Sequence, residues 1–292
     1  MTALVRTTDL SRRYGDVLAL DDVALEIPSG QIVGMLGPNG AGKTTLINLL
    51  VGLRRPSSGT VELRGGDPRD EATRRVIGVT PQETALPEAW RVGELVDFIR
   101  AHFPDPLTRS EALARFDLTE FTDRQVGGLS GGQQRRLAVA LAFVGRPEIV
   151  FLDEPTTGLD VEARRALWEG IRNYHTDGGT VLLTSHYLEE VEALAERVVV
   201  IDHGRVLTDG SLSEVRGLVR LKRVTLTGAR LPELPTAHSI EQEGERIHVL
   251  TDDAATFVRQ LAASGAPFTE IEIRSASLED AFLALTSTER AA

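Results

Sequence analysis

The chain has 292 residues, of which 41% are apolar, and it carries a formal net charge of −11. This length fits one large domain or two of ordinary size, and the negative charge argues against DNA or RNA as the main partner because it repels a phosphate backbone. The chain contains no cysteine, which excludes disulfides, thiolate nucleophiles and cysteine-built zinc sites. Its apolar runs are far shorter than the roughly 20 residues of a membrane-spanning helix, and the N-terminus lacks a secretory signal. We therefore expect a cytoplasmic protein.

The first elements along the chain are strands followed by a glycine-rich loop and a helix. Residues 3–30 and 59–66 alternate between apolar and polar side chains, as half-exposed strands do. Between them, the apolar run 32–36 leads into GPNGAGKTT at residues 37–45. Leucines then recur at helical spacing, at positions 46, 49, 50 and 53, which predicts a helix with one buried face.

The glycine-rich loop satisfies the pattern G-x-x-x-x-G-K-T with Gly37, Gly42, Lys43 and Thr44. Its glycines allow successive backbone N–H groups to turn toward phosphate oxygens, and the helix that follows presents the positive end of its dipole. Lysine suits the centre of this loop because its ammonium is a compact point charge. The pattern therefore predicts a phosphate-binding P-loop.

Polar groups follow each of four short apolar runs, at residues 32–36, 76–80, 149–152 and 181–184. These groups are the P-loop, Gln82, the pair Asp153 and Glu154, and His186. Continuous apolar runs separated by helical patterns indicate a parallel sheet covered on both faces, with ligands bound beyond the carboxyl ends of its strands. We expect an α/β fold in which all four groups converge on one crevice.

The chemistry of these groups suits hydrolysis of a nucleotide. Asp153 and the hydroxyl of Thr44 are candidate magnesium ligands, because Mg²⁺ prefers oxygen ligands and few carboxylates. Glu154 is the candidate general base that polarises the attacking water. His186 is a candidate catalytic residue. Gln82 either ligates magnesium, orients water or belongs to an ordinary turn after a proline.

A second glycine-flanked helix start occurs at LSGGQQRR, residues 129–136, before another run of apolar residues at helical spacing. Ser130 can cap this helix, while Gly131 and Gly132 bring backbone N–H groups close to an anion. The chain thus has more anion-binding machinery than a single nucleotide requires.

Over residues 3–215 the sequence resembles the nucleotide-binding subunit of ABC transporters, in which these motifs occur in the same order. GPNGAGKTT, TPQ, LSGGQ, IVFLDEP, TTGLD and TSH start at residues 37, 80, 129, 149, 156 and 184. The resemblance implies a P-loop cassette with a parallel-sheet core, an antiparallel β flank and a helical lobe at about 83–140. It also implies ATP and Mg²⁺ as cofactors.

By the same resemblance, two cassettes pair head to tail around ATP, as a homodimer. Asn39, Gly40 and Thr45 join the other P-loop residues in binding the nucleotide, and Ser130, Gly132 and Gln133 contact the ATP held by the partner. Asp160 is expected at the dimer seam. Tyr14 is expected to stack on adenine, with packing in the core as the alternative.

Two further regions suggest contacts beyond the nucleotide. Trp90 and Leu86 in the helical lobe are either exposed contacts for a membrane permease or ordinary lobe packing. Residues 216–292 predict a small α+β domain with a helix at 252–263. Its ending, SASLEDAFLALTS, resembles ATPases that serve drug-resistance and polysaccharide exporters with separately encoded permeases, although a dimerisation domain is the alternative.

The leading hypothesis is an ATPase subunit, peripheral on the inner face of the cell membrane, that energises export of an unidentified substrate. The alternative is a soluble cassette that acts on a ribosome or a nucleic-acid complex, against which the single cassette and the negative charge both count. A GTP switch is excluded, because guanine recognition uses an N-K-x-D pattern and the only lysines are Lys43 and Lys222.

Overall fold

The computed structural model describes residues 3–82, 85–218, 221–228, 237, 239–275 and 277–289. The chain divides into two compact units, Met1–Asp209 and Gly210–Ala292. The boundary predicted between residues 215 and 216 falls within helix α8 (Leu212–Leu218), which belongs to the second unit. Each unit has an apolar core of its own.

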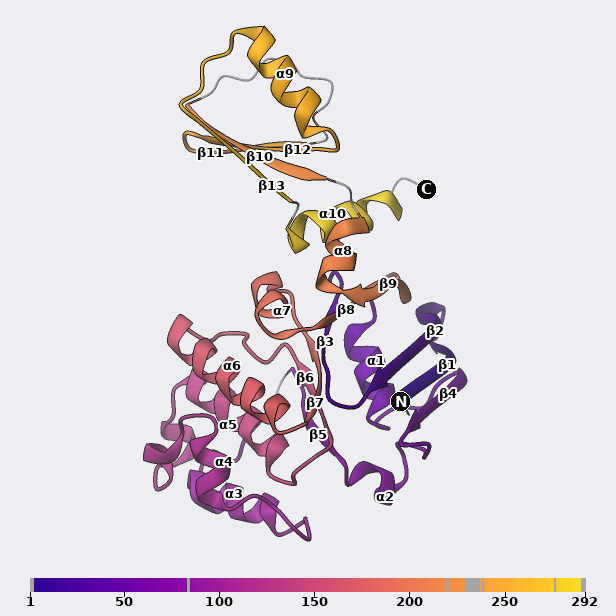
Figure 1. Ribbon diagram of the computed structural model, residues 1–292. Coiled ribbons are helices and arrows are strands. Elements are labelled where there is room, and N and C mark those ends of the chain that lie inside the picture. The colour runs from indigo at the N-terminus through magenta and orange to yellow at the C-terminus, as the bar shows by residue number, and fades with distance from the viewer. Residues whose placement is uncertain are drawn as a thin grey trace. The chain divides into compact units, whose positions relative to one another are not determined.

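The first unit is built on a six-stranded sheet with the strand order β5, β6, β7, β3, β8, β9 (Figure 1). The bounds are β3 (Ile32–Leu36), β5 (Ile77–Thr80), β6 (Ile149–Asp153), β7 (Thr180–Thr184), β8 (Arg197–Asp202) and β9 (Arg205–Ser211). Strand β7 pairs in parallel with β6 and β3, and β5 and β8 extend the parallel pairing outward. Every residue of β3, β6 and β7 is buried, as expected for a parallel sheet with both faces covered. The predicted parallel core is therefore confirmed.

A second sheet, antiparallel and three-stranded, forms the predicted β flank. Its order is β2, β1, β4, with β1 (Ala3–Tyr14), β2 (Val17–Pro28) and β4 (Ser58–Leu63). Burial alternates along much of β2, so its inward side chains reach the core and its outward ones meet solvent.

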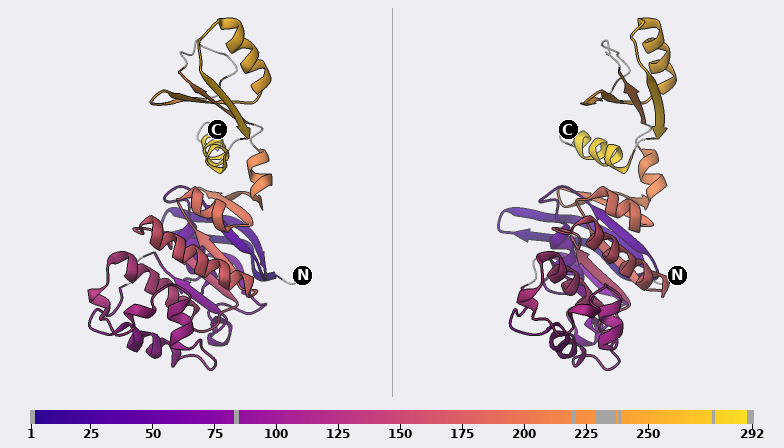
Figure 2. Two further views of the ribbon diagram at one scale, coloured as in Figure 1. Left: turned by 60° about the vertical axis from the view of Figure 1, so that its left-hand side comes forward. Right: turned by 90° about the vertical axis from the view of Figure 1, so that its left-hand side faces the viewer.

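Helices cover the parallel sheet on both faces (Figures 1 and 2). Helix α1 lies between the two sheets, packed on β2, β4 and β6, while α5, α6 and α7 pack on β5–β6, β7 and β3 respectively. The helices of this unit are α1 (Lys43–Leu50), α2 (Glu71–Arg74), α3 (Val92–Arg100), α4 (Arg109–Ala114), α5 (Gly131–Phe143), α6 (Val161–Thr176) and α7 (Leu188–Leu194), with 3₁₀ turns at Thr119–Phe121 and Val126–Gly128. None of the helices in the described ranges has the length and apolar character that crossing a bilayer requires.

The helical lobe consists of α3 and α4 packed against each other and against α5. Trp90, just before α3, is exposed, and its ring meets Phe98 edge-on with centroids 5.2 Å apart. Phe98 is exposed too, and it contacts the ring of His102 at 4.9 Å. Leu86 is half-buried. Trp90 therefore belongs to a solvent-facing aromatic cluster, whereas Leu86 is partly packed.

In the described part of the second unit there are a four-stranded antiparallel sheet and three helices, as in an α+β domain. Its sheet order is β11, β12, β10, β13, with β10 (Lys222–Thr227), β11 (Ser239–Glu243), β12 (Arg246–Thr251) and β13 (Glu270–Ser275). Helix α9 (Ala254–Ser264), close to the predicted 252–263, packs on β10 and buries Phe257 and Leu261. Helix α8 packs against α10 (Leu278–Glu289).

Candidate nucleotide-binding site

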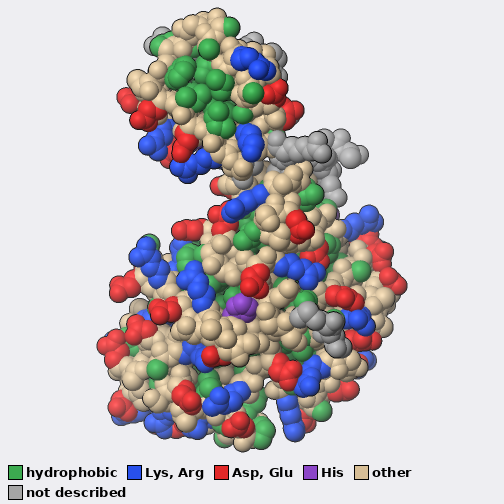
Figure 3. Space-filling model, in the orientation of Figure 1, with side chains coloured by type: hydrophobic (Ala, Val, Ile, Leu, Met, Phe, Trp, Pro, Cys, Tyr) green, Lys and Arg blue, Asp and Glu red, His purple; other side chains and the backbone are tan. Residues whose placement is uncertain are grey.

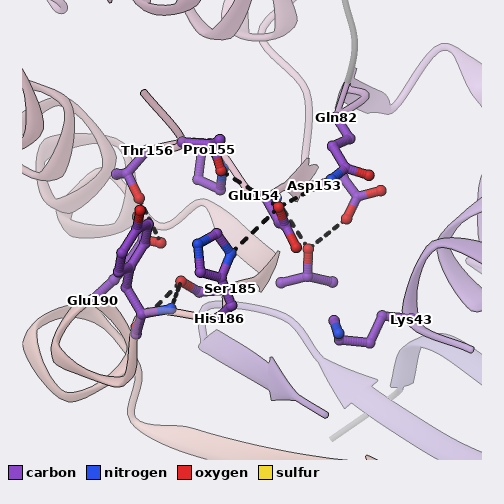
Figure 4. A network of polar contacts seen from close by, with 12 residues as sticks. Lys43, Gln82, Asp153, Glu154, Pro155, Thr156, Ser185, His186 and Glu190 are labelled. Atoms are coloured by element: carbon purple, nitrogen blue, oxygen red, sulfur yellow. Dashed lines mark hydrogen bonds and ion pairs between the residues drawn. The ribbon is translucent and has the colours of Figure 1, made fainter. Parts of the chain in front are cut away.

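The groups predicted to converge do lie together beyond the carboxyl ends of β3, β5, β6 and β7 (Figure 4). The P-loop connects β3 to α1, and Gln82 follows β5. Asp153 ends β6 with Glu154 next to it, and His186 follows β7. Parallel pairing places all of these strand ends at one edge of the sheet, which is why residues distant in sequence meet there.

The P-loop turns sharply because two of its glycines adopt left-handed backbone angles. Gly40 has φ of 85° and Gly42 has φ of 105°, and a Cβ at Gly42 would lie 2.6 Å from the carbonyl oxygen of Ala19. Asn39, Gly40 and Thr44 are exposed at the surface of the loop, and Thr45 is partly buried in the first turn of α1. The backbone can therefore approach an anion closely at the N-terminus of α1.

Lys43 is buried within this loop, and its ammonium donates to the carbonyl oxygens of Gly37 and Pro38 at 2.6 and 2.9 Å. Burial lowers the pKa of Lys43 below its ordinary value, although the negative charges of Glu154 and Asp153 oppose that shift. A bound phosphate would supply a compensating negative charge at this point and favour the protonated ammonium.

Asp153 is buried and joins the P-loop to β7. Its Oδ2 accepts a hydrogen bond from the Thr44 hydroxyl at 2.9 Å, and its Oδ1 accepts one from the Thr184 hydroxyl at 2.5 Å. Thr44 and Asp153 thus present adjacent oxygen atoms, the donor type that Mg²⁺ prefers. Thr184, in TSH, orients the carboxylate, a role that follows from the pairing of β6 with β7 and that sequence reasoning missed.

Glu154 is the point at which the other predicted catalytic groups meet. Its Oε2 accepts from Gln82 Nε2 at 3.0 Å and from the Thr157 hydroxyl at 3.4 Å, and it lies 3.4 Å from His186 Nδ1. Its backbone has φ of 49°, a left-handed conformation uncommon for a non-glycine residue, and its N–H donates to the Thr184 hydroxyl at 3.0 Å. The carboxylate is therefore fixed from several sides. Gln82, one of the predicted magnesium ligands, uses its amide nitrogen for Glu154.

The remaining predicted nucleotide contacts lie elsewhere on the first unit. Ser130 caps α5: its hydroxyl accepts from the N–H of Gln133, and the Gln133 side chain accepts from the N–H of Ser130. Gly132 follows in the first turn of the same helix. Asp160 caps α6 by accepting from the N–H of Ala163 at 2.8 Å.

Tyr14, at the end of β1, has an exposed ring with the guanidinium of Arg12 4.4 Å from its centroid. The alternative that this ring packs in the core is therefore wrong. Arg12 covers one face of the ring, in the geometry of a cation–π contact.

Two charged residues around the site, half-buried Arg135 and buried Glu190, were not predicted. Arg135, in the second turn of α5, donates to the backbone carbonyl groups of Gln82 and Glu154, both at 3.0 Å. Glu190 of α7 accepts from the Thr156 hydroxyl at 3.0 Å and from the Trp168 indole at 3.2 Å. The sequence offers little indication of these two residues, because no local pattern marks which charged residue of a helix faces the site.

Comparison with known proteins identifies the family. Residues 20–157 match the family model described as ABC transporter. The daunorubicin resistance ATP-binding protein DrrA2 of Streptomyces coeruleorubidus is 36% identical, over 97% of this chain and 94% of that protein. The Nod factor export ATP-binding protein I of Ralstonia nicotianae is 35% identical, over 99% of this chain and 95% of that protein.

Solved structures agree with the fold. An ATP-binding subunit of an ABC transporter superposes with a TM-score of 0.67 at 28% identity, covering 74% of this chain and 92% of the other. A dimeric ATP-binding cassette in a post-hydrolysis state bound to ADP and Pi gives 0.64 at 26% identity, covering 71% and 98%. The motifs, the site geometry and these relatives lead to one conclusion: the chain belongs to the exporter-type ATP-binding subunits of ABC transporters, and it binds and hydrolyses ATP.

Proposed function

We propose that the chain hydrolyses magnesium-bound ATP with Glu154 as general base and so energises export of a substrate through a separate membrane permease. The observation that carries this proposal is the position of the Glu154 carboxylate. It lies between Gln82 and His186 and adjoins Asp153, which is bonded to Thr44 of the P-loop. Water attacking a phosphate held by the P-loop would lie close to this carboxylate.

In this mechanism each residue has a separate task. Backbone N–H groups of the P-loop and the Lys43 ammonium bind and orient the phosphates. Thr44 and Asp153 would hold Mg²⁺, which neutralises charge on the β- and γ-phosphates when bound. Glu154 Oε2 accepts the proton of the attacking water. Gln82 and His186 keep that oxygen in place through their contacts of 3.0 and 3.4 Å.

The second half of the site comes from another copy of the chain in this proposal. Ser130, Gly132 and Gln133 lie at the capped start of α5, where backbone N–H groups favour an anion. We infer that these residues contact the ATP bound by the partner and that Asp160 lies at the seam. The dimeric cassette with ADP and Pi among the structural neighbours supports this arrangement.

The names of the relatives and the exposed side chains of the helical lobe support a membrane permease as the partner and a location at the membrane. Resistance to daunorubicin and export of Nod factor appear in the names of the relatives, and both support a role in export. The exposed cluster of Trp90, Phe98 and His102 offers an apolar contact for a membrane partner, at the inner face of the cell membrane. On the face seen in Figure 3, Lys and Arg side chains are interspersed with Asp and Glu, which suits a protein partner better than a nucleic acid.

The variant Glu154→Gln tests the catalytic assignment. Glutamine retains the size of the side chain but accepts a proton far less readily, so we expect ATP hydrolysis to slow by about 100-fold or more. ATP binding should persist, and light scattering should show an ATP-bound dimer that accumulates. Glu148→Gln is the matched control, because Glu148 precedes the same strand and bonds to Arg64 at the surface. Normal turnover by Glu154→Gln would overturn the assignment.

A further inference from the structure

The side chain of Arg135 joins two loops of the active site. Arg135 lies in the second turn of α5, five residues after the Ser130 cap. Its guanidinium donates to five backbone carbonyl groups, those of Pro81 (2.7 Å), Gln82 (3.0 Å), Asp153 (2.6 Å), Glu154 (3.0 Å) and Pro155 (3.2 Å). The first two acceptors belong to the loop after β5, and the other three to the segment that ends β6.

Each nitrogen of the guanidinium bonds to a different set of carbonyl groups. Nη1 bonds to the Gln82 loop, Nη2 bonds to the carbonyl groups of Asp153 and Glu154, and Nε bonds to that of Pro155. Because the guanidinium is planar and rigid, it fixes the distance and angle between the two loops. An ammonium has its three donors on one atom and cannot hold two separate loops in the same way.

The loops that Arg135 joins carry Gln82 and Glu154, whose side chains touch at 3.0 Å. A displacement of either loop would change this contact and move the Glu154 carboxylate. We propose that Arg135 is a positioning residue for ATP hydrolysis, which holds the Gln82 loop against the Glu154 segment and thereby sets the position of the general base. This inference rests on the role proposed above for Glu154.

Arg136, the next residue, provides a matched control. It is buried on another side of α5, where it donates to the carbonyl groups of Phe116 and Asp117 at 3.3 Å and to the Asp117 carboxylate at 3.4 Å. Both arginines thus tie α5 to backbone carbonyl groups, but Arg136 does so within the helical lobe and Arg135 does so at the site. Loss of Arg136 should lower stability without a selective loss of catalysis.

The test compares Arg135→Gln, Arg135→Lys and Arg136→Gln in the full chain, with turnover normalised to the ATP-binding sites found by titration. For Arg135→Gln we expect kcat to fall by about 10- to 100-fold, because small displacements of a catalytic group have effects of this size. The dissociation constant for ATP should change by no more than about threefold, since Arg135 makes no contact with the P-loop among its observed bonds. Arg135→Lys should recover only part of the loss, and Arg136→Gln should keep kcat within about threefold.

A double variant separates positioning from a general structural effect. In a Glu154→Gln background, adding Arg135→Gln should reduce the remaining rate by less than about threefold, because a residue that acts through Glu154 has little left to affect. A full additional loss in that background would overturn the inference. So would an Arg135→Gln protein with wild-type kcat, or one whose ATP affinity and kcat fall together.

The outcomes distinguish this inference from the proposed function. If Glu154→Gln slows hydrolysis and Arg135→Gln does not, only the role of Arg135 fails. If Glu154→Gln turns over normally, the proposed base is wrong and the positioning role fails with it. Should Arg135→Gln not fold, Arg135→Lys keeps the charge and replaces it in the test. A fall in its kcat with an unchanged ATP dissociation constant supports the inference, and a parallel change in both overturns it.

Discussion

Glu190 is a buried carboxylic acid that joins the segment after Glu154 to helix α6. It is fully buried, and it accepts hydrogen bonds from Thr156, which follows Glu154, and from Trp168 of α6. Burial raises the pKa of Glu190 above its ordinary value of 4.5, although its hydrogen bonds oppose that shift. A group whose pKa is higher in the folded state binds more protons there than in the unfolded state.

We therefore predict that ionisation of Glu190 destabilises the fold at neutral pH. The raised pKa adds to the free energy of unfolding in full below pH 4.5, and this stabilisation is lost as the pH rises through the folded-state pKa. The loss amounts to about 1.4 kcal/mol for each pH unit that separates the unfolded-state and folded-state pKa values. Glu190→Gln removes this titration while keeping the side-chain shape. Urea unfolding from pH 5 to pH 8 should show the variant gaining stability relative to the wild type as the pH rises.

The exposed neighbour Glu189 provides the control for that series. Its carboxylate lies 3.6 Å from Arg164 at the surface, so Glu189→Gln should follow the wild-type pH profile within about 0.5 kcal/mol. A constant stability difference between Glu190→Gln and the wild type across the pH range would contradict the assignment.

For individual residues, the sequence predicted those that belong to a recognisable motif. It did not predict those whose role depends on contacts between distant segments. The location of Asp153, Glu154 and His186 after strands was enough to predict that they meet. Glu190 and Arg135 could not be assigned in this way, since their partners come from segments that only the fold brings together.

Among the elements, β5 and α5 pack unusually closely because a glycine lies between them. A Cβ at Gly78 would lie 2.0 Å from the carbonyl oxygen of Ala142 in α5, a contact that requires the backbone to shift. The same interface includes the Thr80 hydroxyl, 3.4 Å from the carbonyl oxygen of Ala138. Because Ser130 caps α5 and Arg135 lies within it, the packing of α5 on β5 determines where both residues lie.

Gly78→Ala should consequently push α5 away from the sheet edge. We predict a loss of about 1–3 kcal/mol in the free energy of unfolding, the usual result of overpacking a close interface. Chemical denaturation measures this value. Gly131→Ala, in the first turn of the same helix, has nothing within 4 Å of its added Cβ and should not lower the unfolding free energy. Equal stabilities of the two variants would show that the interface accommodates the extra methyl group.

The strands were easier to predict than their order. Hydrophobic runs marked β3, β6 and β7 to within a residue or so, because each is buried on both faces and must be apolar throughout. The order β5, β6, β7, β3, β8, β9 depends instead on which crossover helices cover which face, and local sequence patterns do not encode that choice.

At the scale of the whole molecule, composition suggested two domains but placed their boundary inside α8. The predicted boundary between residues 215 and 216 divides this helix, whereas packing assigns all of α8 to the second unit through its contact with α10. Local composition does not report which neighbour a short helix packs on, and this explains the difference in position.

The separate cores predict that the first unit binds ATP without the second. A chain that ends at Ser211 keeps all of β9 and the ion pair between Arg197 and Asp209 at 2.5 Å, and it retains every residue of the proposed site. Its core residues and those of the second unit belong to different clusters. We expect calorimetry to give an ATP dissociation constant within about threefold of the full-length value.

Binding of ATP at the P-loop requires Lys43, so Lys43→Ala in the shortened chain should abolish ATP binding. The solved cassettes that match 71–74% of this chain over more than nine-tenths of their own length show that a cassette of this size is a stable fold. If the shortened chain unfolded, or if it bound ATP more than about tenfold more weakly, a change above 1.4 kcal/mol, residues 212–292 would have to support the nucleotide site directly. The two units would then form one cooperative structure despite their separate cores.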